Sequence, residues 1–319
     1  NQISRIKQNL PAGMDFVQNN DAATIKGLAD DIEILAGWID PAWLLEMPRL
    51  RWVQIWSAGI DRLLPYSDQW KTQFTVTNSS AAHAVQISEH VFALILALGR
   101  NLPNAVTAQK NGVWAQVKNA REALDTPFAF SSGNLLELAN NTMLILGLGA
   151  IGERVAKIAK AFDMHVIGMR RNPHQPSPWV DDMVGPDELM ANLGLADVIV
   201  NILPYTPETR HFLGSLEFTA MKSRAYIINV GRGGTIDEEA LIAALKNGTI
   251  AGAGLDVFEI EPLPDSSPLW TMPNVLITSH YGGATQDYNE RVLEIFLDNL
   301  QRYQDGRPLR NLVDLQLGY

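Results

Sequence analysis

Residues 142–152 read Thr142-Met143-Leu144-Ile145-Leu146-Gly147-Leu148-Gly149-Ala150-Ile151-Gly152. A short apolar run meets a G-x-G-x-x-G motif, and the residues that follow repeat apolar positions at the 3.6-residue period of a helix. This order predicts a strand, a tight turn and a helix that bind the phosphates of a dinucleotide. Gly147 permits the turn, Gly149 lets the backbone approach a pyrophosphate, and Gly152 lets helix and strand pack. The N–H groups of residues 150–152 would face the phosphates.

The composition limits the class of protein. The chain has 319 residues, enough for two domains, with 46% hydrophobic and 19% charged residues. Its net charge of −10 would repel nucleic acids and anionic membrane surfaces. The longest apolar run, Val91 to Leu98, is far shorter than the roughly 20 residues that span a bilayer. The chain has no cysteine for a disulfide, a thiolate nucleophile or a metal ligand. We therefore expect a cytoplasmic protein that binds no nucleic acid, membrane or metal.

The order of predicted elements indicates two α/β domains. Helices and strands alternate along the first 82 residues, which is typical of a parallel sheet covered on both faces. Strands are predicted at residues 14–17, 32–35, 52–56 and 76–78, and helices at 2–10, 22–29 and 41–47. After the dinucleotide turn, strands are predicted at residues 165–169, 198–202, 226–229, 252–257 and 275–278, and helices at 237–247 and 286–302.

This pattern predicts a doubly wound Rossmann domain at residues 83–286. A smaller, flavodoxin-like α/β substrate domain would comprise residues 1–82 and 287–319. A domain that opens on a helix is unusual for this pattern, so a first strand is expected to be missing before Asn1. Residues 100–141 read as an irregular arm with aromatic side chains such as Trp114, and we expect the arm to pack on a second subunit in a homodimer. The alternative is a loop that covers its own domain.

The reactive residues of a Rossmann enzyme should follow the carboxyl ends of its strands. Arg232, Glu261 and His280 meet that condition. An arginine can pair with carboxylate or carbonyl oxygens, and a histidine can donate a proton during hydride transfer to a 2-oxo acid. A carboxylate beside the imidazole would favour its charged form. Glu259 is equally placed to be this carboxylate.

The remaining histidines show no metal-ligand spacing, and for them solvated or core roles are expected: His83, His90, His165, His174 and His211.

Successive motifs resemble those of the D-isomer-specific 2-hydroxyacid dehydrogenases, in the same order and spacing. The likeness extends from Ser57 to Asn311 and so covers most of the chain. The motifs are the Gly147–Gly152 turn, Leu203-Pro204-Tyr205-Thr206-Pro207-Glu208-Thr209-Arg210, Asn229-Val230-Gly231-Arg232-Gly233, Gly254-Leu255-Asp256-Val257-Phe258-Glu259-Ile260-Glu261-Pro262-Leu263-Pro264 and Ser279-His280-Tyr281-Gly282-Gly283-Ala284-Thr285.

The resemblance implies a role for each motif. Arg232 would bind the substrate, His280 would be the acid/base, and Glu261 would orient and charge it, which selects Glu261 over Glu259. The backbone amides of Ser57, Ala58 and Gly59 would bind the substrate carboxylate. The residues implied in cofactor binding are Leu203, Pro204, Thr209, Val230, Gly231 and Asp256, the last near the nicotinamide amide. The implied reaction delivers a hydride to a 2-oxo acid and yields the D-hydroxy acid.

The second Rossmann strand departs from the pattern of NAD-using members. These carry an acid at its end for the ribose hydroxyls, whereas this chain has Arg170 and Arg171. Arg170 follows Gly152 by about the twenty residues expected for that acid. A guanidinium suits a 2′-phosphate. NADP(H) is therefore the expected cofactor, as in the glyoxylate and hydroxypyruvate reductase branch, and NAD(H) is the alternative.

Other functions compete with a 2-oxo acid reductase. Corepressors share this fold and its catalytic residues, so a nucleotide-sensing binding module without turnover is the main alternative. A formate dehydrogenase is a third possibility, but those enzymes resemble this pattern with glutamine in place of Glu261, so the acid counts against that function. Phosphoglycerate dehydrogenase is less favoured, because no regulatory domain follows and the pocket candidates Trp38, Trp56 and Tyr281 are bulky and uncharged. The 2-oxo acid itself is not specified by the residues.

Overall fold

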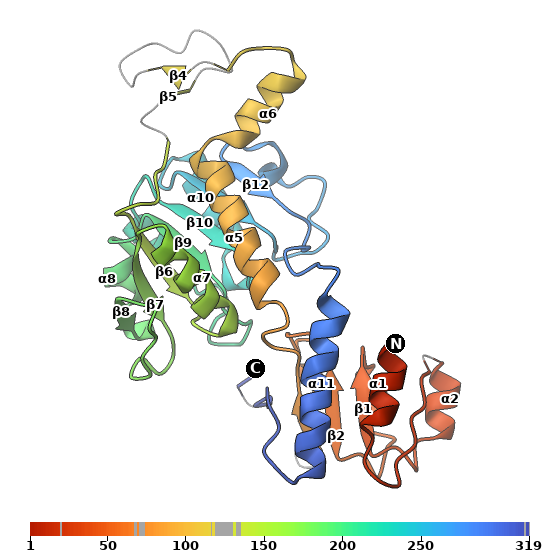
Figure 1. The fold of residues 1–319 in the computed structure, drawn as a ribbon. Helices are drawn as coiled ribbons and strands as arrows, with labels where there is room; N and C mark the ends of the chain where they lie inside the picture. The colour runs from red at the N-terminus through yellow and green to blue at the C-terminus, as the bar shows by residue number, and fades with distance from the viewer. Residues whose placement is uncertain are drawn as a thin grey trace. The chain divides into compact units, whose positions relative to one another are not determined.

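The computed structural model describes residues 1–19, 21–66, 69, 74–115, 117–118, 130–131, 135–315 and 317–318. These residues form two compact units, one from residues 1–83 and 284–319 and one from residues 84–283. Figure 1 shows the helices and strands of each unit.

The second unit is built on a seven-stranded sheet with the order β12-β11-β10-β9-β6-β7-β8. Every neighbouring pair in it is parallel. The strands are β6 (Thr142–Leu146), β7 (His165–Met169), β8 (Asp182–Val184), β9 (Val198–Asn201), β10 (Tyr226–Asn229), β11 (Gly252–Leu255) and β12 (Val275–Ile277). The strand order reverses between β6 and β9, and such a point is where doubly wound sheets bind ligands at the carboxyl ends of their strands.

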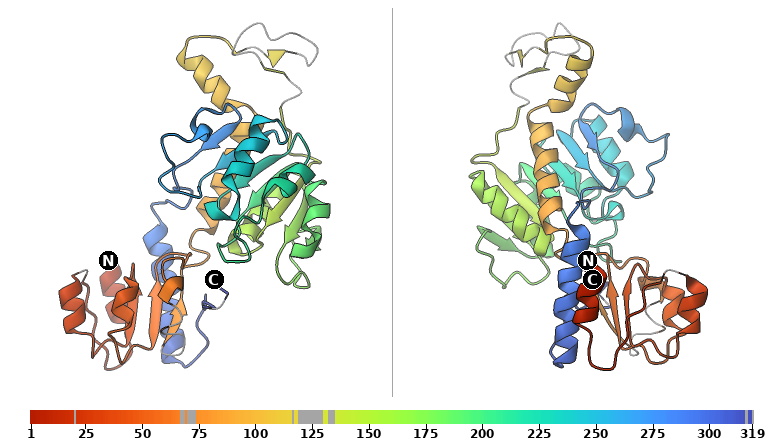
Figure 2. Two further views of the ribbon diagram at one scale, coloured as in Figure 1. Left: turned by 180° about the vertical axis from the view of Figure 1, so that it is seen from behind. Right: turned by 45° about the vertical axis from the view of Figure 1, so that its right-hand side comes forward.

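Helices cover both faces of this sheet because successive side chains of each strand point to opposite sides. Leu144 and Leu146 of β6 join the core beneath one set of helices, while Met143 and Ile145 join the core on the other face. Helices α5 (Ala84–Gly99) and α7 (Ala150–Ala161) pack together on the second face (Figure 2). The first face carries α8 (Leu189–Leu193), α9 (Ser215–Ala220) and α10 (Glu238–Lys246).

The first unit has a three-stranded parallel sheet with the order β1-β2-β3. Its elements are α1 (Gln2–Gln8), α2 (Ala22–Gly27), β1 (Ile34–Gly37), α3 (Pro41–Leu44), β2 (Trp52–Ile55), η1 (Leu64–Tyr66), β3 (Thr75–Thr77) and α11 (Tyr288–Gln304). Trp52 is fully buried, and its ring stacks on Phe296 of α11 at 5.5 Å and on Tyr303 at 5.6 Å. Helix α11, close to the C-terminal end of the chain, therefore packs against the sheet formed by the N-terminal residues.

Three details differ from the sequence predictions. Residues 14–17 form no strand: Phe16 packs beside the α11 core, and the segment pairs with no strand of the described sheets. A strand needs a partner, which four residues cannot specify by themselves. The expected irregular arm begins with a helix, α6 (Leu102–Lys110), that has Pro103 in its first turn. Strand β8 was not predicted, since it has only three residues and starts with an exposed aspartate.

Most of the remaining arm lies outside the described residues, apart from the paired segments β4 (Val117–Lys118) and β5 (Phe130–Ser131). The short helical turns of the second unit are η3 (Pro186–Glu188), η4 (Gly233–Thr235) and η5 (Pro268–Thr271). Among the described residues, no single helix has the length and apolar character to cross a membrane; only α5 and α6 together pass that test, across a bend of 68°.

Candidate active site

The β6–α7 turn has the backbone geometry that its glycines predict. Gly147 adopts a φ of +98°, which L side chains rarely take, and a Cβ there would lie 3.0 Å from the Ile202 carbonyl oxygen. A Cβ on Gly152 would lie 2.4 Å from the carbonyl oxygen of Gly147. Both positions therefore require glycine for reasons internal to the chain.

Gly149 is different, because a Cβ there would meet nothing within 4 Å. Gly149 is also the N-cap of α7, and no side chain caps this end of the helix. The N–H groups of Ala150 and Ile151 therefore begin a twelve-residue helix at the point where the sheet reverses its strand order. An open glycine and an uncapped helix N-terminus fit the pyrophosphate of a dinucleotide.

Arg170 and Arg171 follow β7, at the next strand end. The Arg170 guanidinium donates to Glu153 Oε1 at 2.6 Å and to Gln175 Oε1 at 3.0 Å, and its side chain is only 15% exposed. Glu153 lies in the first turn of α7 and also accepts from the hydroxyl of Ser177. Arg171 is exposed, and its charge helps to lower the pKa of Glu208, after the larger effect of a hydrogen bond from Thr206. Two cations thus stand beside the dinucleotide turn.

The loop after β9 holds Leu203, Pro204 and Thr209. Its shape is fixed internally, since the Thr209 hydroxyl donates to the Pro204 carbonyl at 2.6 Å and accepts from the N–H of Thr206 at 2.8 Å. Leu203 is buried. The loop after β10 packs against it: a Cβ on Gly231 would lie 2.7 Å from the Leu203 carbonyl oxygen.

Arg232 projects from this β10 loop, between the buried Val230 and the turn η4. Its carbonyl accepts from the hydroxyl of Thr235 at 2.6 Å, and the Asn229 amide oxygen accepts from the N–H of Gly231. The guanidinium donates to the Gly231 carbonyl at 2.8 Å. Buried polar groups thus fix the backbone that presents the arginine.

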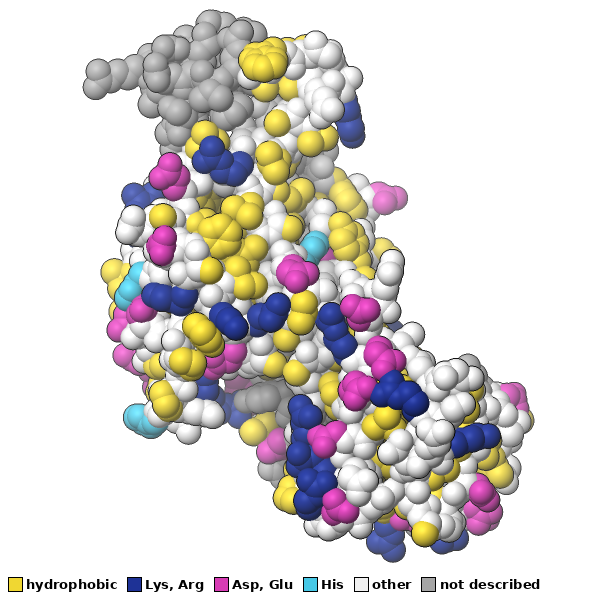
Figure 3. Space-filling model, viewed as in Figure 1, with side chains coloured by type: hydrophobic (Ala, Val, Ile, Leu, Met, Phe, Trp, Pro, Cys, Tyr) yellow, Lys and Arg dark blue, Asp and Glu magenta, His cyan; other side chains and the backbone are white. Residues whose placement is uncertain are grey.

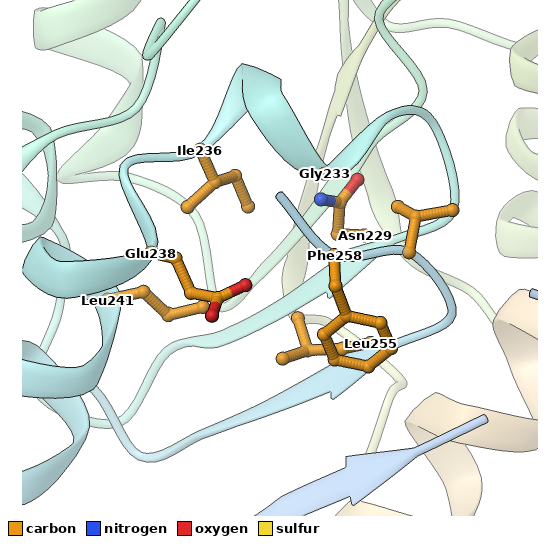
Figure 4. Close-up of a pocket in the computed structure, with 8 residues that line it drawn as sticks. Asn229, Gly233, Ile236, Glu238, Leu241, Leu255 and Phe258 are labelled. Carbon is orange, nitrogen blue, oxygen red and sulfur yellow. The ribbon is translucent and has the colours of Figure 1, made fainter. Parts of the chain in front are cut away.

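Gly233 presses the same loop against the segment after β11. A Cβ at Gly233 would lie 1.9 Å from the Phe258 backbone. Gly233 and Phe258 line a small cavity together with Leu241 and Leu255, and Figure 4 shows the residues around it. The cavity measures about 10 Å³, room for about one water molecule, so it is a packing gap behind the loop and no substrate pocket.

His280 and Glu261 contact each other directly. Nδ1 of His280 lies 2.6 Å from Oε2 of Glu261, and Oε1 of Glu261 accepts from the N–H of Phe258 at 2.9 Å. An ionised carboxylate can only accept, so Nδ1 carries the proton in this bond and Nε2 is left for a ligand. The imidazole is about half exposed, with 51% of its side-chain surface accessible. It can therefore exchange a proton with a bound molecule.

Glu259, the competing acid, has another partner. Its Oε1 lies 2.8 Å from Nε2 of His211, which takes a left-handed φ of +49°. The Glu259 N–H donates to Glu238, whose pKa is raised by burial and by the nearby Glu259 charge. Sequence reasoning gave His211 a solvated or core role and missed this pair. The two acids on one segment thus serve two different histidines.

Asp256 is buried, and both its carboxylate oxygens accept hydrogen bonds from the His280 segment. Oδ1 accepts from the Thr278 hydroxyl at 2.6 Å and the Tyr281 N–H at 3.1 Å, and Oδ2 accepts from the Gly282 N–H at 3.0 Å. Its place after β11 suits a cofactor-binding residue, yet its contacts are structural.

Ser57, Ala58 and Gly59 follow β2 in the first unit. The Ser57 hydroxyl donates to the Gly59 carbonyl at 2.6 Å, and the Asn78 side chain donates to the Ala58 carbonyl at 2.7 Å. The loop is therefore folded upon itself at the carboxyl end of its own sheet. In the described part of the chain, no group of three or more His, Asp or Glu side chains could hold a metal ion.

Comparison with known proteins points to one family. Residues 92–282 match the family model described as D-isomer specific 2-hydroxyacid dehydrogenase, NAD binding domain. The chain is 33% identical over 286 residues to glyoxylate reductase of Aeropyrum pernix, covering 89% of this chain and 82% of the relative. It is 36% identical over 242 residues to D-3-phosphoglycerate dehydrogenase of Methanocaldococcus jannaschii, covering 75% of this chain but only 43% of that relative.

The fold is likewise similar to solved structures. An NADPH-dependent glyoxylate/hydroxypyruvate reductase from Sinorhizobium meliloti, solved with NADP and sulfate, aligns with a TM-score of 0.81 and 26% sequence identity. The alignment covers 100% of this chain and 96% of that one. Both α/β units therefore have counterparts in one solved enzyme.

Proposed function

Because this chain belongs to the D-isomer specific 2-hydroxyacid dehydrogenase family, we propose that it reduces a 2-oxo acid to the D-2-hydroxy acid with a nicotinamide cofactor. The observation that carries the proposal is the Glu261–His280 pair at 2.6 Å, which follows neighbouring strands of the dinucleotide-binding sheet. The proteins to which this chain is similar include a glyoxylate reductase and a glyoxylate/hydroxypyruvate reductase, and this similarity supports a small 2-oxo acid as the substrate.

A nicotinamide cofactor bound at the Gly147–Gly152 turn would supply the hydride that reduces the carbonyl carbon of the substrate. His280 holds a proton on Nε2 and gives it to the carbonyl oxygen, while Glu261 keeps Nδ1 protonated and the ring oriented. Arg232 pairs with the substrate's oxygen atoms as a planar, permanently charged fork. The amides of the Ser57–Gly59 loop bind the substrate carboxylate.

We propose that the cofactor lies along the carboxyl ends of β6, β7, β9, β10 and β11. The Gly147–Gly152 turn would hold the pyrophosphate, and Arg170 with Arg171 would hold a 2′-phosphate, so NADP(H) is preferred over NAD(H). Two facts support the preference: no acid occupies the end of β7, and a similar enzyme binds NADP. Leu203, Pro204, Thr209, Val230, Gly231 and Asp256 complete the proposed cofactor site.

The test is steady-state oxidation of NADPH and NADH with glyoxylate, hydroxypyruvate, and larger branched or aromatic 2-oxo acids. We expect turnover with at least one acid and a higher kcat/KM with NADPH. Binding of NADPH without turnover on any acid would instead favour the nucleotide-sensing module. Turnover with NADH alone would overturn the cofactor proposal and leave the reaction class standing.

A cytoplasmic homodimer that uses no nucleic acid or membrane partner is also proposed. Its support is the net charge of −10 and a set of exposed apolar side chains at the start of the arm. These side chains are Leu102, Val106, Val113 and Trp114, on and just after α6. Figure 3 shows hydrophobic side chains near its top, over the region of α6.

A further inference from the structure

His280 occupies a strained backbone position. Its φ is +52°, in the left-handed region that residues other than glycine take at a cost of about 1 kcal/mol or more. Such a conformation persists only where neighbouring groups hold it. Here the His280 N–H donates to the Asp256 carbonyl at 2.9 Å, and the next two N–H groups, of Tyr281 and Gly282, donate to the Asp256 carboxylate. Asp256 therefore holds the turn of residues 280–282 through three hydrogen bonds, and we call it the clamp of this turn.

The clamp has a support of its own. The hydroxyl of Thr278 donates to Oδ1 of Asp256 at 2.6 Å, which fixes the carboxylate from the β12 side. Behind both lies His90, on α5, with its Nε2 at 2.9 Å from Thr278 Oγ1 and at 3.6 Å from Asp256 Oδ1. The His90 side chain is 14% exposed, so little water competes for these bonds.

The proton arrangement in this chain can be deduced. A threonine hydroxyl has one proton, and that of Thr278 goes to Asp256, so Thr278 Oγ1 must accept from His90. His90 is thereby an N–H donor at Nε2. Its ring also lies edge-on to Tyr281 at 5.5 Å, and a Cβ on Gly282 would lie 2.9 Å from His90 Cδ2. The imidazole is thus in contact with the turn as well as with its clamp.

We propose that His90 is a positioning residue for the reduction: through Thr278 and Asp256 it holds the turn that presents His280. The inference rests on the proposed function of His280. The sequence predicted only a solvated or core role for His90, because it lies in an apolar helix and outside the family motifs. A shift of about 1 Å in a reacting group can cost on the order of 10² in rate, so a residue without substrate contact can control kcat.

The test compares His90→Leu with His90→Gln. Leucine fills the space and removes the donor, whereas glutamine carries an N–H donor at nearly the reach of Nε2. We expect His90→Leu to lower kcat by about tenfold to a hundredfold with little change in KM for either substrate. His90→Gln should recover most of that loss. Thr278→Val should give a similar loss, and the double variant His90→Leu/Thr278→Val should be no worse than either, because both break one chain.

Phe92→Leu provides the matched control on the same helix. Phe92 is buried and stacks on Phe162 at 5.3 Å, on the α7 side of α5. Its substitution should lower the melting temperature and leave kcat near the wild-type value. If Phe92→Leu reduced kcat as much as His90→Leu, or if His90→Gln were as slow as His90→Leu, general loosening of α5 would explain the effect and the proposal would be wrong.

Amide hydrogen exchange separates this proposal from the proposed function. The N–H groups of Tyr281 and Gly282 should exchange faster in His90→Leu, by about tenfold, whether or not the protein reduces any 2-oxo acid. Wild-type exchange at both amides in that variant would overturn the positioning role. An inactive wild-type protein with the expected exchange would instead contradict only the proposed reaction.

Discussion

At the scale of single residues, the two acids after β11 have separate partners, and this can be tested with matched variants. Glu261→Gln should lower kcat for reduction by a factor on the order of 10², because the uncharged amide no longer orients and supports the His280 imidazole as an acid. Glu259→Gln changes the same side chain two residues away, where the partner is His211. Its kcat should stay close to the wild-type value. Equal losses in the two variants would contradict the assignment of Glu261.

The two arginines after β7 predict the choice of cofactor. Arg170→Gln and Arg171→Gln should each lower the ratio of kcat/KM for NADPH to that for NADH, since each removes a cation from the proposed 2′-phosphate site. The double variant should lose roughly tenfold or more of the ratio. Arg170 also forms an ion pair with Glu153, so Arg170→Gln could lower the stability of the protein as well as its affinity for the cofactor. The melting temperatures of Arg170→Gln and Arg171→Gln should therefore be compared. An unchanged ratio in the double variant would place the 2′-phosphate elsewhere.

At the scale of elements, the turn between β6 and α7 separates folding from binding. Gly152→Ala places a Cβ 2.4 Å from the Gly147 carbonyl oxygen and should destabilise the protein by about 1 to 3 kcal/mol. Gly149→Ala meets nothing in the chain, so the melting temperature should stay near that of the wild type while the KM for the cofactor rises. Thermal denaturation and steady-state kinetics of the two variants distinguish these roles. A Gly149→Ala enzyme with unchanged KM would argue against a pyrophosphate at this turn.

Asp197 lies at the amino ends of the strands of the same sheet, opposite the candidate active site, and links β6 to the segment before β10. It is buried, and it accepts from the N–H of Thr142, the first residue of β6, and from Lys222 and Arg224, which precede β10. Burial alone would raise its pKa, but these donors outweigh burial and lower the pKa below its ordinary value of 3.8. Its stabilising contribution is therefore complete above about pH 3.8 and is lost as the pH falls through the lower folded pKa.

Asp197→Asn should accordingly destabilise the fold by about 1 to 3 kcal/mol at neutral pH, because an amide group replaces one acceptor among cationic donors. The difference in unfolding free energy between the variant and the wild type should shrink as the pH falls below about 3.8. The kcat should be preserved, since the proposed active site lies at the carboxyl ends of the strands and Asp197 lies at their amino ends. Urea denaturation at several pH values measures this. A pH-independent difference would show that charge is not the cause.

At the scale of the whole molecule, we expect a homodimer formed through the arm. Light scattering should give about twice the 35.2 kDa of one chain. Leu102 and Val106 lie one helical turn apart on α6 and are 48% and 47% exposed, so Leu102→Glu with Val106→Glu should shift the mass toward that of the monomer. A wild-type mass of 35.2 kDa at micromolar concentration would exclude the dimer.

Much of the architecture follows from the sequence alone. The β6–α7 unit, its glycines and the alternation of strands and helices are local: backbone conformation and side-chain period are properties of neighbouring residues. The placement of Arg232, Glu261 and His280 after successive strands also follows, because parallel strands share one carboxyl edge. Strand 14–17 was wrong and β8 was missed, because a short strand depends on a partner that lies elsewhere in the chain.

Only the tertiary structure decides which side chains meet. Glu259 and Glu261 are two residues apart, and nothing local shows that the first reaches His211 and the second His280. His90 is separated from Thr278 by most of the second unit, and their contact exists only because α5 packs against the strands that precede the site. Sequence specifies the backbone of this site through short-range sterics, whereas its hydrogen-bond partners are fixed by long-range packing, which no local period encodes.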